Sequence, residues 1–207
     1  MVTASLPAED VVMVHTDWST YCALVAGLGE DASGVRLAYD GRTLEIMSPS
    51  ADHEVVTRLL EALVRRFASE HNIELDGFGS MTLRHEPDGA EPDASFYLRR
   101  GDAVRGKARI DVSVDPAPEI VVEVDISRRR NDKRALYRRL GVLELWRYDG
   151  ARLHAFDLSQ DGGNELQRST QLAGLVFAEL EELLDLRWTL RQGEIERRWR
   201  ERLAIRP

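Results

Sequence analysis

The stretch Glu119-Ile120-Val121-Val122-Glu123-Val124-Asp125-Ile126 decides the fold, because it is the clearest strand in the sequence. β-Branched side chains dominate it and favour an extended backbone. Side chains alternate between the two faces of a strand, so Glu123 and Asp125 share one face. The other face is apolar and carries Ile120, Val122, Val124 and Ile126. The sequence therefore predicts a strand that holds carboxylates next to a hydrophobic core.

The residues before this strand predict a hairpin, a helix and several short strands. Asp40-Gly41 is a strong hairpin-turn dipeptide between two alternating segments. From His53 onward, leucine and valine recur at helical spacing and form one apolar face. The elements predicted on this side are helices at 16–28 and 53–69, hairpin strands at 35–39 and 43–47, and short strands at 73–75, 81–85 and 93–98.

The residues after the strand predict a helix, a second hairpin and two more helices. Gly141 is a typical helix stop, and Asp149-Gly150 is a second hairpin turn. The elements predicted on this side are a helix at 132–140, strands at 143–148 and 152–157, a weak strand near Leu166, and helices at 177–184 and 188–202.

This order of elements predicts an α/β or α+β fold with one mixed β-sheet, flanked by helices and preceded by an N-terminal β-hairpin. A chain of 207 residues suits a single domain. We expect one domain over residues 1–207, with a core at about 35–157 and a C-terminal helical extension at about 176–207.

Net charge, apolar runs and cysteine content restrict the classes of protein to which this chain can belong. The net charge of −8 disfavours broad electrostatic binding of nucleic acid, although one local basic face is compatible with it. No apolar run is long enough to cross a bilayer, and the acidic N-terminal stretch does not fit a signal peptide. Cys22 is the only cysteine, which fits a reducing compartment. We therefore expect a cytoplasmic protein that does not bind membranes.

Three acids are candidates for chemistry: Glu45, Asp93 and Glu123. Each stands within or at the start of a predicted strand, and a carboxylate among core residues is costly to desolvate. A divalent cation such as Mg²⁺ is the usual compensation for clustered oxygens. Exposure at a sheet edge, or pairing with arginine, is the alternative for each acid. Asp125 either shares the metal with Glu123 or binds a backbone or arginine partner.

Lys133 is the candidate catalytic lysine. Lysine occurs only at Lys107 and Lys133, whereas arginine fills every other basic position. Lys133 lies near the start of the helix after the central strand, so it can reach back over the face that carries Glu123. There it would orient an attacking water or balance the charge of a phosphate. A solvated helix lysine is the alternative.

Several short motifs together resemble the Uma-type (Uma-two) family of restriction-endonuclease-like proteins. The resemblance covers roughly residues 35–150. The motifs are Glu45-Ile46-Met47-Ser48-Pro49-Ser50 followed by His53, Glu91-Pro92-Asp93, residues 118–127, Asp132-Lys133 followed by Tyr137, and residues 141–150.

The resemblance implies the PD-(D/E)xK nuclease fold, with a core of a helix, three strands, a helix and a fourth strand. It implies that Asp93 and Glu123 hold Mg²⁺ or Mn²⁺, and that Glu45 is the preceding acid of the family. His53 matches a histidine at a helix start. The superfamily lysine is expected two residues after Glu123, where this chain has Asp125. In the Uma-type pattern the lysine lies in the following helix, and Lys133 matches it.

These observations predict a metal-dependent endonuclease that hydrolyses phosphodiester bonds, with DNA as its partner. A homodimer would suit the cutting of two strands. A cluster of arginines follows the predicted site and would bind the nucleic-acid backbone, or else balance the charge of acids elsewhere. Its members are Arg128, Arg129, Arg130, Arg134, Arg138 and Arg139. The alternatives are a catalytically inactive nuclease-fold module for nucleic-acid binding or dimerisation, and a metal-dependent hydrolase of nucleotides.

Overall fold

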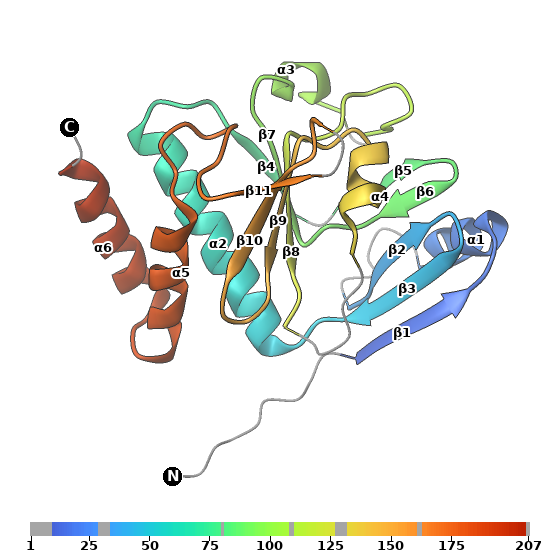
Figure 1. The fold of residues 1–207 in the computed structure, drawn as a ribbon, viewed down its shortest axis with the longest axis horizontal. Coiled ribbons are helices and arrows are strands. Elements are labelled where there is room, and N and C mark those ends of the chain that lie inside the picture. Colours follow the sequence, from blue (N-terminus) through green and yellow to red (C-terminus); the bar gives the residue numbers. More distant parts are fainter. Residues whose placement is uncertain are drawn as a thin grey trace, which may run out of the picture.

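The computed structural model of the protein describes residues 10–28, 34–79, 81–107, 110–126, 132–160 and 163–205. Within these residues the strands form two sheets, one of five strands and one of six. Figure 1 shows the long helix α2 (Ala51–Glu70) crossing the six-stranded sheet, with α5 (Phe177–Asp185) and α6 (Gln192–Ala204) on its side. The five-stranded sheet lies at the opposite side of the molecule.

The six-stranded sheet is mixed, as the sequence predicts, and has the order β11-β10-β9-β8-β7-β4. The central pair β8–β9 is parallel and the other pairs are antiparallel. A parallel pair needs a crossover connection, and this one contains the short helix α4 (Arg134–Arg139). The strands are β4 (Asp76–Phe78), β7 (Ala94–Tyr97), β8 (Ile120–Val124), β9 (Glu144–Tyr148), β10 (Leu153–Asp157) and β11 (Asn164–Leu166).

The expectation of a single sheet is wrong, because the N-terminal hairpin belongs to a separate antiparallel sheet. The hairpin strand β2 pairs with β6, with Ala38 opposite Ala90. Pro92 separates β6 from β7, and a proline cannot donate a hydrogen bond to a sheet. The strands, in spatial order, are β1 (Asp10–His15), β3 (Thr43–Ser48), β2 (Arg36–Asp40), β6 (Asp88–Ala90) and β5 (Leu83–His85).

The helices follow the predicted periodicity, with shifts at their ends. The helix α2 begins after Ser50, whose side chain accepts a hydrogen bond from the His53 amide at 3.2 Å. The predicted strand at 73–75 is misplaced, because the Ile73 amide still donates to Ala68 at the helix end. The final helix starts at Gln192, where Glu194 accepts from the Arg191 amide. The remaining helices are α1 (Trp18–Leu28), α3 (Gly101–Val104) and η1 (Leu186–Trp188).

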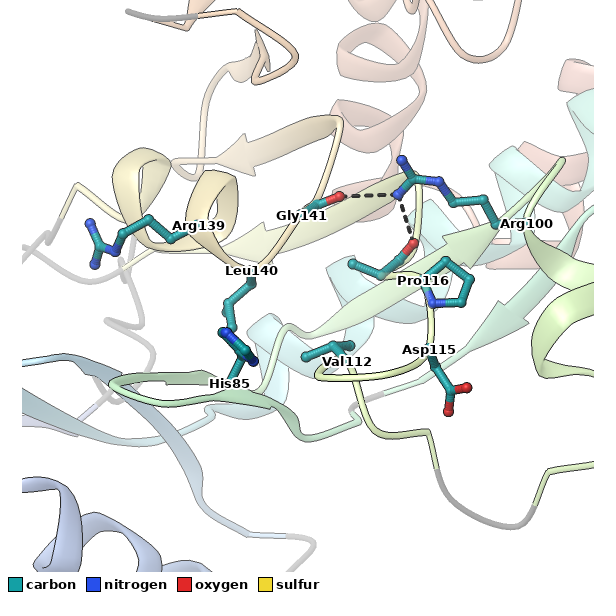
Figure 2. A pocket seen from close by; sticks show the side chains of 9 residues that line it. His85, Arg100, Val112, Asp115, Pro116, Arg139, Leu140 and Gly141 are labelled. Atoms are coloured by element: carbon teal, nitrogen blue, oxygen red, sulfur yellow. Dashed lines mark hydrogen bonds between the residues drawn. The ribbon is translucent and has the colours of Figure 1, made fainter.

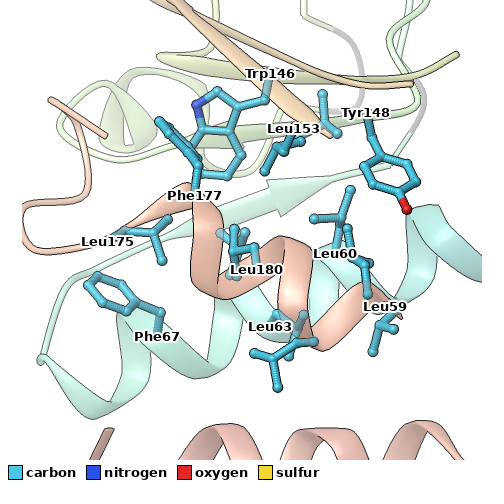
Figure 3. Close-up of a cluster of buried hydrophobic side chains, with 14 of the residues drawn as sticks. Leu59, Leu60, Leu63, Phe67, Trp146, Tyr148, Leu153, Leu175, Phe177 and Leu180 are labelled. Atoms are coloured by element: carbon cyan, nitrogen blue, oxygen red, sulfur yellow. The ribbon is translucent and has the colours of Figure 1, made fainter. Parts of the chain in front are cut away.

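The alternation of β8 is confirmed by the two cores on its faces. Ile120 and Val122 belong to the larger core, which α2, α5 and α6 cover (Figure 3). Val121 belongs to a second core, together with Leu136 of α4 and Leu145 of β9. The strand is therefore buried on both sides, and Glu123 points toward the side of α4. None of the helices described is long and apolar enough to span a membrane.

Candidate carboxylate and lysine site

Asp93 and Glu123 lie close together at one end of the β7–β8 pair. Asp93 directly precedes β7, and the last registered pair at this end is Ala94 with Val122. The Asp93 amide donates to the Val122 carbonyl at 3.0 Å, and the Asp93 Oδ2 accepts from the Val124 amide at 2.7 Å. These two hydrogen bonds hold Asp93 against the backbone on both sides of Glu123. The negative charge of Asp93 also raises the pKa of Glu123.

Asp93 is buried, and one of its oxygens has no hydrogen-bond partner among the residues that the structure describes. Its Oδ2 lies 3.1 Å from Nε2 of His53, which stands in the first turn of α2. Its Oδ1 lies 3.8 Å from Nε of Arg36, and no group in the described residues donates a hydrogen bond to it. Buried polar atoms are normally paired, so this oxygen is suited to an added ligand.

Glu123 is buried and bound at both oxygens. Its Oε2 accepts from Nζ of Lys133 at 2.8 Å, and its Oε1 accepts from the hydroxyl of Tyr137. Burial raises the pKa of Glu123, the charge of Lys133 lowers it, and the charge of Asp93 raises it again, to about 7 overall. The carboxyl group therefore exchanges its proton near neutral pH, which suits a functional site.

Lys133 bridges two carboxylates from different sheets. Its Nζ lies 2.8 Å from Oε1 of Glu45 and 2.8 Å from Oε2 of Glu123. Burial alone would lower the pKa of Lys133, but the two carboxylates outweigh it and raise the pKa above the usual value. Lys133 is thus a charged ammonium at neutral pH. Glu45 comes from β3 of the five-stranded sheet, so the site joins the two sheets.

The four side chains selected from the sequence as catalytic therefore lie together: Glu45, Asp93, Glu123 and Lys133. Asp125 follows β8, is half-buried, and donates its amide to the Tyr148 carbonyl at 2.8 Å. Its place in a metal site stays a prediction. In the described residues, no group of three or more His, Cys, Asp or Glu side chains is arranged to hold a metal ion.

Sequence reasoning missed the roles of Arg36 and Tyr137. Tyr137 stands four residues after Lys133, and its amide donates to the Lys133 carbonyl at 2.9 Å. Residues four apart share a helix face, and this spacing is a signal that could have found Tyr137. Burial and the Glu123 charge raise the pKa of Tyr137 well above its usual value, so it donates as a neutral phenol. No comparable signal marks Arg36 in the sequence, because strand pairing in the folded protein is what brings β2 and Arg36 next to Asp93.

The predicted arginine cluster divides into two parts. Arg128, Arg129 and Arg130 lie outside the described residues. Arg134 donates from Nε to Asp132 at 2.9 Å, and Arg139 donates from Nε to Asp88 at 2.7 Å. These two arginines balance nearby acids, which fits the alternative given for the cluster.

A cavity of about 390 Å³ lies on another side of α4 (Figure 2). Arg139, Leu140 and Gly141 line the cavity, and His85 lies beside Leu140. Arg100 is engaged there, since its Nη1 donates to the carbonyls of Ala117 and Gly141 at 3.0 Å each. None of the four clustered side chains lines this cavity. The carboxylate and lysine cluster is therefore the better candidate site.

Comparisons with known proteins agree with this geometry. A crystal structure described as "a putative nuclease belonging to DUF820", from Anabaena variabilis, shares the fold with a TM-score of 0.52 and 14% identity, over 77% of this chain and 96% of that chain. The curated proteins contain no match. The model of the family described as "Uma2: Putative restriction endonuclease" matches residues 18–193. Since that match spans most of the chain, this protein belongs to the Uma2 family of restriction-endonuclease-like nucleases.

Proposed function

We propose that this protein is a divalent-metal-dependent endonuclease that hydrolyses phosphodiester bonds of DNA. One observation carries the proposal: Asp93 is hydrogen-bonded to the backbone on both sides of Glu123, and Lys133 contacts Glu123 at 2.8 Å. Carboxylates that hold a metal ion, together with an ammonium that stabilises negative charge, can support hydrolysis of a phosphate ester. DNA is the proposed substrate because the family to which the chain belongs is described as "Putative restriction endonuclease".

The carboxylates fit a hard divalent cation. Among the described residues, none donates a hydrogen bond to the buried Oδ1 of Asp93, and Glu123 lies beside Asp93. Mg²⁺ commonly uses only one or two protein carboxylates, completed by water and substrate oxygens. Asp93 and Glu123 would hold Mg²⁺ or Mn²⁺, with Asp125 as an additional ligand. When bound, the ion would stabilise negative charge on the scissile phosphate and lower the pKa of a water molecule.

The surrounding side chains position these groups. The Val124 amide and His53 hold Asp93, and the Tyr137 hydroxyl holds Oε1 of Glu123. Glu45 also contacts the ammonium of Lys133, at 2.8 Å. Lys133 would then donate a hydrogen bond to the attacking water or to a phosphate oxygen. A site whose members are already oriented lowers the entropic part of the reaction barrier.

The test is cleavage of plasmid and of single-stranded DNA in Mn²⁺ or Mg²⁺, with EDTA as the metal-free control. Asp93→Ala and Glu123→Ala are the test variants. Asp102→Ala is the matched control, because the Asp102 side chain is 84% exposed and lies on the separate helix α3. We expect cleavage by the wild type and by the control, and none by the two test variants. Equal cleavage by all four proteins would assign the activity to a contaminant.

Two finer parts of the proposal need their own measurements. RNA of the same sequence, offered beside DNA, tests the choice of substrate. Light scattering tests the homodimer, which would have twice the chain mass of 23.4 kDa. A dimer would bring two sites to the two strands of a duplex.

A catalytically inactive nucleic-acid-binding or dimerisation module is the second candidate. Lys133 forms ion pairs with both Glu45 and Glu123, and this arrangement favours the candidate because it can neutralise the carboxylates without a metal. Calorimetric titration with Mn²⁺ separates the two functions. Binding that requires Asp93 and Glu123 supports the nuclease. Nucleic-acid binding without metal binding or cleavage supports the module.

A further inference from the structure

Two buried polar atoms at the edge of the site face each other without a hydrogen bond. Nε of Arg36 and Oδ1 of Asp93 lie 3.8 Å apart, too far for a hydrogen bond. Neither atom has a hydrogen-bond partner in the described part of the chain. Because a buried unpaired polar atom is costly, each atom is suited to an added partner: a cation or a donor for Oδ1, and an acceptor for Nε.

The guanidinium of Arg36 has further unused donors. Its Nη1 donates to the Val35 carbonyl at 3.3 Å, and its Nη2 lies 3.8 Å from Oε1 of Glu54. No other hydrogen bond of this side chain occurs within the described residues. Guanidinium has five N–H donors in a planar fork that matches the oxygens of a phosphate. Arg36 therefore has the capacity to bind an anion.

Lys133, the other cation of the site, has less of this capacity. Two carboxylates contact its Nζ at 2.8 Å each, so its charge is already balanced. A phosphodiester that approaches Glu45, Asp93 and Glu123 meets like charge, and the chain as a whole carries −8. A cation with free donors is needed to offset this repulsion.

Arg36 also lies where a substrate can reach it. Its side chain is 15% exposed, whereas that of Asp93 is 1% exposed. Glu54, on the outer side of Arg36, is 39% exposed. The guanidinium thus stands between solvent and the buried carboxylate, on strand β2.

We propose that Arg36 binds a phosphate oxygen of the nucleic acid beside Asp93, as a substrate-binding residue of the site. This inference rests on the proposed function and adds to it the group that receives the phosphodiester anion. The competing role for Arg36 is a counter-charge that only stabilises Asp93. The two roles differ in what the loss of the guanidinium changes. A phosphate contact affects nucleic-acid affinity, whereas a counter-charge affects metal affinity and folding stability.

The experiment compares Arg36→Gln and Arg36→Lys with the control Arg58→Gln. Arg58 loses the same charge, but its side chain is 63% exposed and pairs with Glu61 on α2. Binding of a fluorescently labelled short DNA duplex is measured by anisotropy in Ca²⁺, after a gel has verified that the duplex stays intact. Each protein is measured over a range of salt concentrations. Mn²⁺ affinity without DNA and the urea unfolding midpoint are measured in parallel.

We expect Arg36→Gln to weaken duplex binding about tenfold or more and to reduce the slope of log affinity against log salt by about one, as for one lost phosphate contact. Arg36→Lys keeps the positive charge but loses the planar array of guanidinium donors. The duplex affinity of this variant should therefore lie between those of the wild type and Arg36→Gln. Arg58→Gln should bind within about twofold of the wild type. Mn²⁺ affinity should stay the same or rise in Arg36→Gln, because Asp93 loses a neighbouring cation.

Duplex affinity and salt slope in Arg36→Gln that equal those of Arg58→Gln would overturn the inference. So would weakened Mn²⁺ binding or a lowered unfolding midpoint with unchanged duplex binding, since that result assigns the counter-charge role. If Arg36→Gln does not fold, Arg36→Lys decides by the same criteria. Wild-type protein that binds no DNA and cleaves none would overturn the proposed function and this inference together. That outcome is distinct from wild-type binding that Arg36→Gln leaves unchanged.

Discussion

Nζ of Lys133 lies 2.8 Å from Oε2 of Glu123. Glu123 stands in strand β8, whereas Lys133 stands at the start of α4, the helix that follows this strand. The position two residues after Glu123, where the nuclease superfamily pattern places a lysine, is Asp125. The ammonium therefore reaches the same carboxylate from a different backbone segment.

Replacement of Lys133 should abolish cleavage and spare metal binding. Lys133→Met removes the proposed donor to water or phosphate, and such groups contribute about 10²–10⁴-fold to rate. Lys107→Met is the matched control, since Lys107 is the other lysine of the chain and pairs with Asp115 away from the site. Cleavage rates and Mn²⁺ calorimetry are the measurements. Lys133→Met with the rate of Lys107→Met would remove Lys133 from the mechanism.

Metal affinity should depend on pH near neutrality. The pKa of Glu123 is raised to about 7, chiefly by burial, so the group keeps its proton to a higher pH than an ordinary glutamate. A metal ligand must be ionised, so Mn²⁺ affinity should rise as the pH increases through about 7. At pH values below about 7 the affinity should be lower. Calorimetry from pH 5.5 to 8.5 measures this change. Glu123→Gln should bind weakly at every pH; a wild-type affinity that stays flat over this range contradicts the prediction.

Tyr137→Phe should move the acidic limb of the pH–rate profile upward. The Tyr137 hydroxyl donates to Glu123 and lowers the pKa of that carboxyl group. Loss of this hydrogen bond should raise the pKa of Glu123 by about one unit, because the bond to the carboxylate is expected to be worth about 1.4 kcal/mol, the energy of one pKa unit. The measurement is kcat/KM against pH. Tyr39→Phe is a control, because the Tyr39 hydroxyl donates to the Thr16 carbonyl outside the site. An unmoved profile together with a lower unfolding midpoint would leave Tyr137 a purely structural role.

The C-terminal helix should contribute strongly to stability. Trp199 is fully buried against α2 and donates from Nε1 to the Leu63 carbonyl at 2.9 Å. Trp199→Ala should lower the free energy of unfolding by about 3–5 kcal/mol, as for other large-to-small core substitutions. Trp188→Ala is the control, because Trp188 is 60% exposed and should change stability little. Urea unfolding followed by circular dichroism measures both. Equal losses in the two variants would show that α6 is not part of the cooperative core.

Much of this site could be predicted because its signals are local. Alternation around Glu123 identifies the strand and its two faces, and the proline before Asp93 marks the start of the next strand. Lys133 stands out by the scarcity of lysine. The mixed sheet around β8 followed from the helix between it and β9.

The remaining features depend on contacts that a single sequence does not encode locally. Pairing of β2 with β6 creates the second sheet, and strands that short have weak periodicity. Strand β1 was not predicted either, and it pairs with β3 although helix α1 and strand β2 lie between the two strands in the sequence. Arg36 reaches Asp93 only because the two sheets meet there. Tertiary pairing decided each of these, so residue propensity alone could not predict them.

The ion pair between Glu45 and Lys133 crosses from one sheet to the other, and this has a consequence for the order in which the protein matures. Glu45 is synthesised early and Lys133 late, and the pair forms only once both sheets have folded and docked. A nascent chain that has folded its first sheet alone would hold an acid without its cation partner. The proposed site is therefore complete only after the two sheets have docked, and a fragment that contains one sheet alone lacks it.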